Sequence, residues 1–164
     1  MSTTVRQAVQ QAVREQPIPV AEVAQVRHLD HLNLTVKNLQ ASLDFYRALF
    51  GFEVVERDVR PDGVPWAIVR TEAAMLCLYE FPDLDVGPSY PAPPDRLTMA
   101  HFALRITNGP AFYELLKRRE IPLLFDGPVE WPHSTSYYIA DPSGHQIEVV
   151  QWNQDTIAFD ELSR

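Results

Sequence analysis

The same order of secondary-structure patterns occurs twice along this chain, and that repeat limits its fold more than any other feature. A strand-like alternation begins at His31, a helical pattern follows over residues 39–50, and three more strand patterns end at residue 81. The series starts again at His101 and ends at Trp152. Because one unit alone would leave a sheet face bare, we expect an α+β fold. In it, paired βαβββ modules form an open, cup-shaped mixed β-sheet barrel with helices outside.

Local signals set the expected boundaries of the elements. Asn38 suits the N-cap of the first helix, and Gly51 suits its C-terminal stop. Asn108-Gly109-Pro110 opens the second helix, because proline is favoured in the first helical turn. The strands predicted after each helix cover residues 52–57, 64–70 and 74–81 in the first unit, and residues 121–125, 134–140 and 146–152 in the second.

Segments outside the repeat complete the predicted organisation. The first residues form an expected N-terminal arm, a short helix plus an extended segment, because Pro17 ends the helical spacing. A proline-dense stretch between the units cannot continue a strand and is expected to be a linker. The arm covers residues 1–27, the domain covers 28–152 (module 1 at 28–81, linker at 82–98, module 2 at 99–152), and a tail covers 153–164.

Charge and cysteine content exclude several classes of protein. The net charge is −8, whereas a protein that binds nucleic acid or an anionic membrane normally carries a basic face. The single cysteine, Cys77, excludes an intrachain disulfide and gives no sign of an oxidising compartment. The N-terminus lacks a secretory pattern, and no apolar run is long enough to cross a bilayer. We therefore expect a cytoplasmic protein with a small-molecule substrate and no nucleic-acid or membrane partner.

Three residues of metal-ligand type fall on one face of the predicted sheets. In each strand, apolar residues that pack under a helix alternate with residues that face the concave side. This places His31, His101 and Glu148 in the cup. Two imidazoles and a carboxylate leave coordination positions open for a substrate, a set that suits Fe(II), Mn(II), Zn(II), Ni(II) or Co(II). Each of the three alone would be an ordinary strand residue, and their common face predicts one divalent metal ion per chain.

Other residues are candidates for contact with a substrate. They are Asn33, Trp66, Tyr79, Arg105 and Trp152. Arg105 would be costly to bury unpaired, so it meets either an acidic neighbour or an anionic substrate. The aromatic residues either line a pocket or fill the core. Cys77 is expected to be a small buried apolar residue, with a reactive or metal-bound thiolate as the alternative.

Five stretches carry a resemblance to a known superfamily. Residues 30–34 (DHLNL), 43–46 (LDFY) and 49–52 (LFGF) resemble the first module of the glyoxalase, bleomycin-resistance and extradiol-dioxygenase proteins, the vicinal oxygen chelate superfamily. Residues 99–104 (MAHFAL) resemble the start of its second module. Residues 138–148 (YIADPSGHQIE) resemble the closing hairpin of that module, and this is the most specific of the five.

The resemblance covers about residues 28–152 and implies paired βαβββ modules around one metal ion. It puts ligands on the first strand of each module and on the last strand of the second. His31, His101 and Glu148 occupy those positions. The superfamily often pairs modules between chains, so the resemblance also favours a homodimer.

The branches of the superfamily differ in their ligands. In glyoxalases and some epimerases, a Glu or Gln on the last strand of the first module is a fourth ligand. Cys77 is the best match to that position here, so the usual fourth ligand is replaced. This departure favours the three-ligand members, which are ring-cleaving dioxygenases and fosfomycin-resistance enzymes. The cations that fosfomycin thiol transferases use are not evident in residues 126–132. Tyr138 precedes Glu148 by ten residues, like the tyrosine that binds the phenolate in extradiol dioxygenases, and His133 is a candidate acid or base.

The favoured hypothesis is therefore an Fe(II)-dependent ring-cleaving dioxygenase of the extradiol type, acting on a molecule with two adjacent oxygens. One alternative is a glyoxalase-like isomerase or lyase, or a transferase like those of fosfomycin resistance. An alternative of another class is a metal-free protein that sequesters a drug, as bleomycin-resistance proteins do. The retained ligand set argues against this last alternative, because sequestration needs no pair of histidines.

Overall fold

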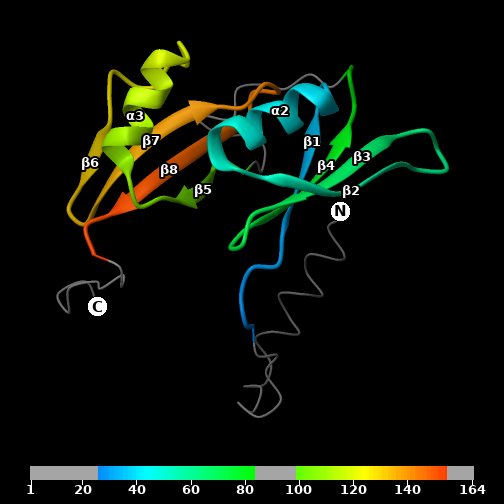
Figure 1. Cartoon of the computed structure of the whole chain (residues 1–164), viewed down its shortest axis with the longest axis horizontal. Coiled ribbons are helices and arrows are strands. Elements are labelled where there is room, and N and C mark those ends of the chain that lie inside the picture. Colours follow the sequence, from blue (N-terminus) through cyan, green and yellow to red (C-terminus); the bar gives the residue numbers. More distant parts are fainter. Residues whose placement is uncertain (1–25, 84–98, 155–164) are drawn as a thin grey trace, which may run out of the picture. The chain divides into compact units, whose positions relative to one another are not determined.

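The computed structural model describes residues 26–83 and 99–154. The chain divides into two compact units, Met1–Asp30 and His31–Arg164, and every described helix and strand belongs to the second (Figure 1). Nearly all of the predicted arm, linker and tail lies outside the described residues.

The described elements follow the predicted repeat. The first module contains β1 (Leu32–Val36), α2 (Leu39–Phe50), β2 (Glu53–Val59), β3 (Pro65–Arg70) and β4 (Met75–Glu80). The second module contains β5 (Phe102–Arg105), α3 (Gly109–Arg118), β6 (Val129–Trp131), β7 (Ser134–Ala140) and β8 (Gln146–Trp152). The paired βαβββ modules are confirmed, and the bounds of α2, β7 and β8 agree with the predicted ranges.

Each module forms its own open mixed sheet. The strand order is β1-β4-β3-β2 in the first sheet and β5-β8-β7-β6 in the second. In both, the first strand pairs in parallel with the last strand, and the remaining neighbours are antiparallel. The two sheets are not joined by ladder hydrogen bonds, so the described chain holds two open sheets and no closed barrel. We call the sheet face opposite the helix the open face of each module.

Apolar residues alternate as predicted and pack each helix onto its own sheet. Leu34 and Leu78 lie on neighbouring strands beneath α2 and are at most 2% exposed. In the second module, Ile147 and Val149 form the same layer beneath α3. Removing a side chain of this size from water contributes about 1.5–3 kcal/mol, so these layers fix which face of each sheet stays open.

The two helices begin differently. The Asn38 side chain accepts a hydrogen bond from the Ala41 N–H and caps α2, and Gly51 ends that helix with a φ of 70°, as the sequence predicts. Asn108 occupies the matching position before α3 but makes no capping hydrogen bond. Instead, the Gln151 Oε1 atom on β8 accepts the Gly109 N–H at 2.6 Å.

The strand predicted over residues 121–125 is wrong. This stretch is irregular, and the edge strand β6 lies further along the chain at Val129–Trp131. Pro122 has no N–H to donate to a ladder. A hydrogen bond from Leu124 N to the Tyr138 carbonyl and an edge-to-face contact between the Phe125 and Tyr138 rings connect the segment to β7.

The closing turn of the second module is bound to the first module. The buried Tyr46 hydroxyl on α2 donates to the Asp141 carboxylate at 3.0 Å. The His145 Nε2 atom lies 2.7 Å from the Thr35 carbonyl oxygen at the end of β1. Burial, together with the Asp141 charge, raises the pKa of Tyr46 far above its usual value, so its hydroxyl stays a donor. The YIADPSGHQIE stretch therefore joins the modules as well as closing a hairpin.

Within residues 26–83 and 99–154, no helix has the length and apolar character needed to span a membrane.

Candidate metal centre

Two of the three predicted ligands meet on the open face of the second module. His101 directly precedes β5, and Glu148 lies on β8 opposite Ala103 in the parallel ladder. The His101 Nε2 atom is 3.1 Å from Glu148 Oε2. The two side chains are 34% and 17% exposed, so solutes can reach the pair from one side.

The other carboxylate oxygen is held by two hydroxyl groups. Glu148 Oε1 accepts hydrogen bonds from Ser136 Oγ at 2.6 Å and from the Tyr138 hydroxyl at 3.0 Å. Burial, followed by this bond to Glu148, raises the pKa of Tyr138, which keeps its hydroxyl protonated as a donor. The carboxylate is therefore fixed with Oε2 directed at the imidazole.

The spacing of this pair matches that of two neighbouring ligands on one metal ion. Ligand atoms about 2.1 Å from a metal and at right angles to each other are about 3.0 Å apart. Nε2 is the nitrogen of His101 that faces the carboxylate, and its Nδ1 atom is buried with no hydrogen-bond partner in the described part of the chain. The donor set of one imidazole and one oriented carboxylate fits a divalent ion.

A pocket of about 340 Å³ lies beside the pair. It brings together Glu148 with three residues that the sequence predicts as site residues, Tyr138, His133 and Trp152. It also includes Trp131, which sequence reasoning missed. Trp131 lies opposite Ser134 in the ladder of β6 and β7, on the same face as Ser136, so correct placement of β6 would have found it. The pocket walls are largely aromatic.

His31 does not join this group. It is exposed and lies immediately before β1 in the first module. Among the described residues, no cluster of three or more His, Cys, Asp and Glu side chains could hold a metal ion. The three-residue ligand set therefore stays a prediction. Within one chain, two of its members, His101 and Glu148, lie together.

The open face of the first module carries three more of the predicted residues, Asn33, Trp66 and Tyr79. Trp66 and Tyr79 pair across β3 and β4, with stacked rings whose centroids are 6.5 Å apart. The Arg60 guanidinium lies 5.6 Å from the centre of the Tyr79 ring. Asn33 lies opposite Cys77, just as Ala103 lies opposite Glu148 in the second module.

That correspondence explains how the two modules differ. Cys77 occupies the place in the first module that Glu148 occupies in the second, as the predicted match to a fourth-ligand position requires. Glu80 faces the helix side, because its carboxylate accepts the Leu39 N–H at 2.6 Å. The Arg105 side chain extends toward the residues that follow β8, where its Nη2 atom donates to the Gln154 carbonyl oxygen at 2.8 Å.

Two linked βαβββ modules, each with a histidine at the start of its first strand, define a class of paired-module proteins whose open sheets provide the halves of a cup. The chain belongs to the Glyoxalase/Bleomycin resistance protein/Dioxygenase superfamily, whose sequence pattern matches residues 28–149. The predicted resemblance is thus confirmed. This superfamily includes enzymes.

Individual relatives share the sequence or the fold. A lactoylglutathione lyase of Neisseria meningitidis is 26% identical over 140 residues, which cover 79% of this chain and 95% of the relative. A glyoxalase family protein from Enterococcus faecalis has a TM-score of 0.64 at 21% identity, covering 76% and 97% of the two chains. The fosfomycin resistance protein FosX of Listeria monocytogenes, in complex with Mn(II) and sulfate, has a TM-score of 0.57 at 18% identity, covering 80% and 97%.

Proposed function

We propose that this protein is a divalent-metal-dependent enzyme that carries out lyase or isomerase chemistry on a small molecule with two adjacent oxygens. The observation that supports this most is the His101–Glu148 pair, 3.1 Å apart, with the second carboxylate oxygen fixed by two hydroxyl groups. Such fixed ligand geometry beside a pocket is typical of a metal site with open positions. The match to a lactoylglutathione lyase over 95% of its length supports this class of reaction.

In this proposal, His101 Nε2 and Glu148 Oε2 hold the metal ion, and His31 supplies the third ligand from a second copy of the chain. A bound divalent ion would polarise both substrate oxygens and stabilise developing negative charge. Tyr138 and Ser136 keep the carboxylate oriented. His133 lines the adjoining pocket and is the candidate that accepts or returns a proton, because imidazole titrates near neutral pH.

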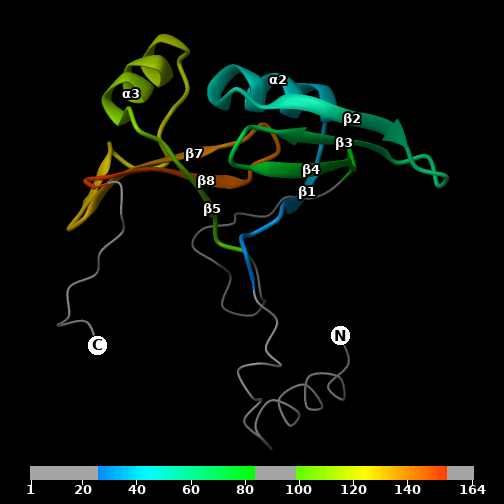
Figure 2. The ribbon, with the colours of Figure 1, turned by 60° about the horizontal axis from the view of Figure 1, so that its bottom comes forward.

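The arrangement of the helices supports a site shared between two chains. Figure 2 shows α2 and α3 on the same side of the two sheets, so both open faces are directed away from the helices. A cup needs two open faces that oppose each other, which the modules of one chain do not provide. In a symmetric homodimer, the first module of each chain could cover the second module of its partner.

A second candidate is the Fe(II)-dependent ring-cleaving dioxygenase that the sequence favours. The aromatic walls of the pocket, including Trp131 and Trp152, suit a flat ring. The Tyr138 hydroxyl, however, already donates to Glu148, and a role in binding a phenolate would require it to leave that partner. The relatives also support the lyase and fosfomycin-resistance alternatives more than a dioxygenase. We therefore rank it second.

Elemental analysis of protein purified without oxygen and without a metal-chelating tag tests the proposal. We expect about one Mn, Ni, Zn, Co or Fe ion per chain, lost in His101→Ala and Glu148→Gln. The control Glu114→Gln, which alters an exposed residue on α3 outside the candidate metal centre, should retain it. Turnover of a 2-oxoaldehyde–thiol adduct without O₂ would support the lyase, whereas catechol cleavage that consumes O₂ would support the dioxygenase. A protein that stays metal-free after reconstitution would contradict both and favour metal-free drug binding.

A further inference from the structure

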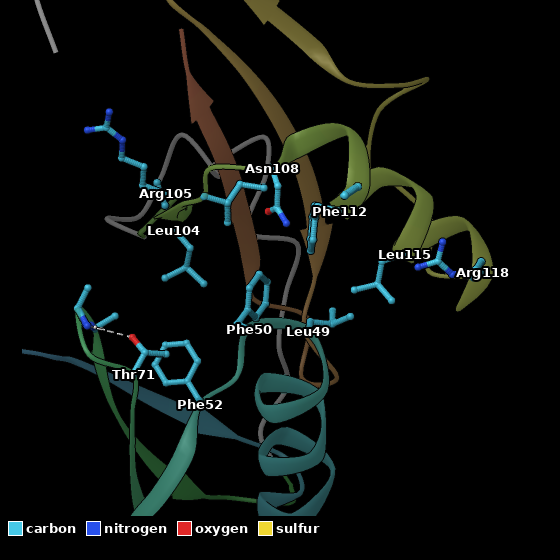
Figure 3. Close-up of a pocket in the computed structure, with 15 residues that line it drawn as sticks. Leu49, Phe50, Phe52, Thr71, Leu104, Arg105, Asn108, Phe112, Leu115 and Arg118 are labelled. Carbon is cyan, nitrogen blue, oxygen red and sulfur yellow. Dashed lines mark hydrogen bonds between the residues drawn. The ribbon is translucent and has the colours of Figure 1, made fainter. Parts of the chain in front are cut away.

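A second pocket, of about 560 Å³, lies between the end of α2 and α3 (Figure 3). The end of α2 and the turn between β3 and β4 form its first wall, and β5 and α3 form its second. It shares no lining residue with the pocket beside Glu148. Its volume lies in the range of small-molecule sites, which is about 300–1,000 Å³.

Aromatic and aliphatic side chains form the larger part of the lining of this pocket. The rings of Phe50 and Phe112, from different modules, stack with centroids 5.8 Å apart. Phe52 lies beside them and is 2% exposed. In Figure 3, Leu104 and Leu115 extend the same apolar surface on either side of the aromatic rings. A molecule that occupies this space would gain its affinity from apolar burial.

The side-chain amide of Asn108, which makes no capping hydrogen bond, lines the pocket. Asn108 would be expected to cap α3, as Asn38 caps α2, but Gln151 takes the Gly109 N–H instead. The Asn108 side chain therefore makes no capping bond and turns toward Phe50 (Figure 3). A polar group aimed into an apolar pocket fixes the orientation of a ligand more than it adds affinity.

The guanidinium of Arg118 lies at the other end of the pocket. Arg118 is the last residue of α3, and Figure 3 shows its guanidinium turned toward Leu115. Throughout the described segments, Arg118 forms no ion pair within 4.0 Å. Arg105 contributes to the wall, but its guanidinium points away and binds the Gln154 carbonyl. Arg118 is thus the cation available to an anionic group in the pocket.

The pocket follows the length of α3. Its lining residues Asn108, Ala111, Leu115 and Arg118 recur at helical spacing along one face. Ten helical residues span about 15 Å. An extended ten-carbon chain, at about 1.2 Å per bond, is about 11 Å long and fits within that length with room for its head group.

We propose that this pocket binds a linear medium-chain carboxylate, with its alkyl chain along Phe50 and Phe112 and its carboxylate at Arg118. The charge complementarity of Arg118 and the apolar floor select an anionic amphiphile over a neutral or fully polar ligand. This pocket shares no residue with the metal centre, so ligand binding here can be tested separately from the proposed enzymatic function. Because both modules form its walls, an occupied pocket also holds the modules together.

Isothermal titration calorimetry of the full chain with decanoate, and with decanol as the neutral counterpart, tests the proposal. We expect saturable binding of one decanoate per chain, about tenfold tighter than decanol. Ala111→Trp, which fills the pocket from an exposed helix position, should abolish both. The matched control Ala48→Trp, an exposed alanine on α2 outside the pocket, should bind as wild type does.

Charge reversal distinguishes this pocket from general apolar binding. Arg118→Glu should weaken decanoate about tenfold or more and leave decanol unchanged, because only the head group meets that residue. The control Arg119→Glu changes the neighbouring exposed residue, which does not line the pocket, and should have little effect. No saturable binding to the wild-type chain, or equal decanoate binding to wild type and Ala111→Trp, would overturn the proposal. Equal losses in Arg118→Glu and Arg119→Glu would overturn the assignment of the head group.

Discussion

The imidazole of His101 and the carboxylate of Glu148 are 3.1 Å apart, and Ser136 and Tyr138 both donate to the carboxylate oxygen that faces away from the imidazole. The second module therefore presents an oriented pair of ligand atoms before any substrate arrives. Preorganisation of this kind lowers the cost of assembling a metal site.

Tyr138→Phe and Ser136→Ala should each weaken metal binding. Each change removes one hydrogen bond that holds Glu148 Oε1, and loss of such a supporting contact typically reduces metal affinity about 10- to 100-fold. Competition with a fluorescent chelator measures the affinity. Thr135→Val is the control, because the Thr135 hydroxyl donates to Glu130 on the surface. Unchanged affinity in both site variants would show that the hydroxyl groups do not orient the ligand.

Tyr46→Phe should destabilise the junction between the modules. The change removes the bond to Asp141 in a fully buried position and leaves a carboxylate oxygen short of one donor. We expect the free energy of unfolding in urea to fall by about 1–3 kcal/mol. Tyr113→Phe is the matched control, since the ring of Tyr113 contacts Lys117 and would keep that contact. An equal, small effect of the two changes would refute the proposed role of the Tyr46 hydroxyl.

Alkaline pH should destabilise the protein through the same tyrosine. Burial raises the pKa of Tyr46 above its unfolded value of 10.0, so above pH 10 the unfolded state loses a proton that the folded state keeps. The contribution of the protonated Tyr46 hydroxyl to the free energy of unfolding is therefore complete below pH 10 and is lost as the pH rises further. One such group changes the stability by about 1.4 kcal/mol per pH unit. Urea titrations from pH 9 to about 11 should show a shallower decline in Tyr46→Phe than in wild type, and identical slopes would contradict the assignment.

Gly109→Ala should disturb the start of α3. A Cβ atom there would lie 2.6 Å from Gln151 Oε1 and 2.7 Å from the Tyr137 hydroxyl, which is closer than real contacts allow. Such overpacking costs about 1–3 kcal/mol, and hydrogen exchange should increase in the first turn of α3. Gly51→Ala meets open space but adopts a positive φ, so its cost should appear at the end of α2 instead. Protection of α3 that is equal in wild type and Gly109→Ala would contradict the close packing.

Much of the second module could be predicted from the sequence. The alternation in the YIADPSGHQIE stretch places Tyr138 and Glu148 on one face, and the ladder of β7 and β8 pairs those two residues directly. Trp131 and Ser136 were missed for different reasons. Trp131 lies on β6, which has only three residues and too little alternation to detect, and Ser136 is a residue type that seldom attracts attention as a ligand partner.

The position of His31 could not be predicted in this way. Alternation assigns a residue to a face of its own sheet, but the relation between two sheets depends on contacts such as Tyr46 with Asp141 and Phe50 with Phe112. These contacts join side chains far apart in the sequence. The absence of a capping bond from Asn108 could not be predicted from the sequence either, because it depends on Gln151 accepting the Gly109 N–H from β8.

The most direct test of a site shared between chains is to mix two inactive variants. His31→Ala and Glu148→Gln chains, refolded together, would form mixed dimers in which one site keeps His31 from one chain and Glu148 from the other. Random pairing should therefore restore about a quarter of the wild-type metal content and activity. Each variant alone should show neither. If the mixture stays as metal-free as its components while the wild type binds metal, all ligands come from one chain and the shared site is contradicted.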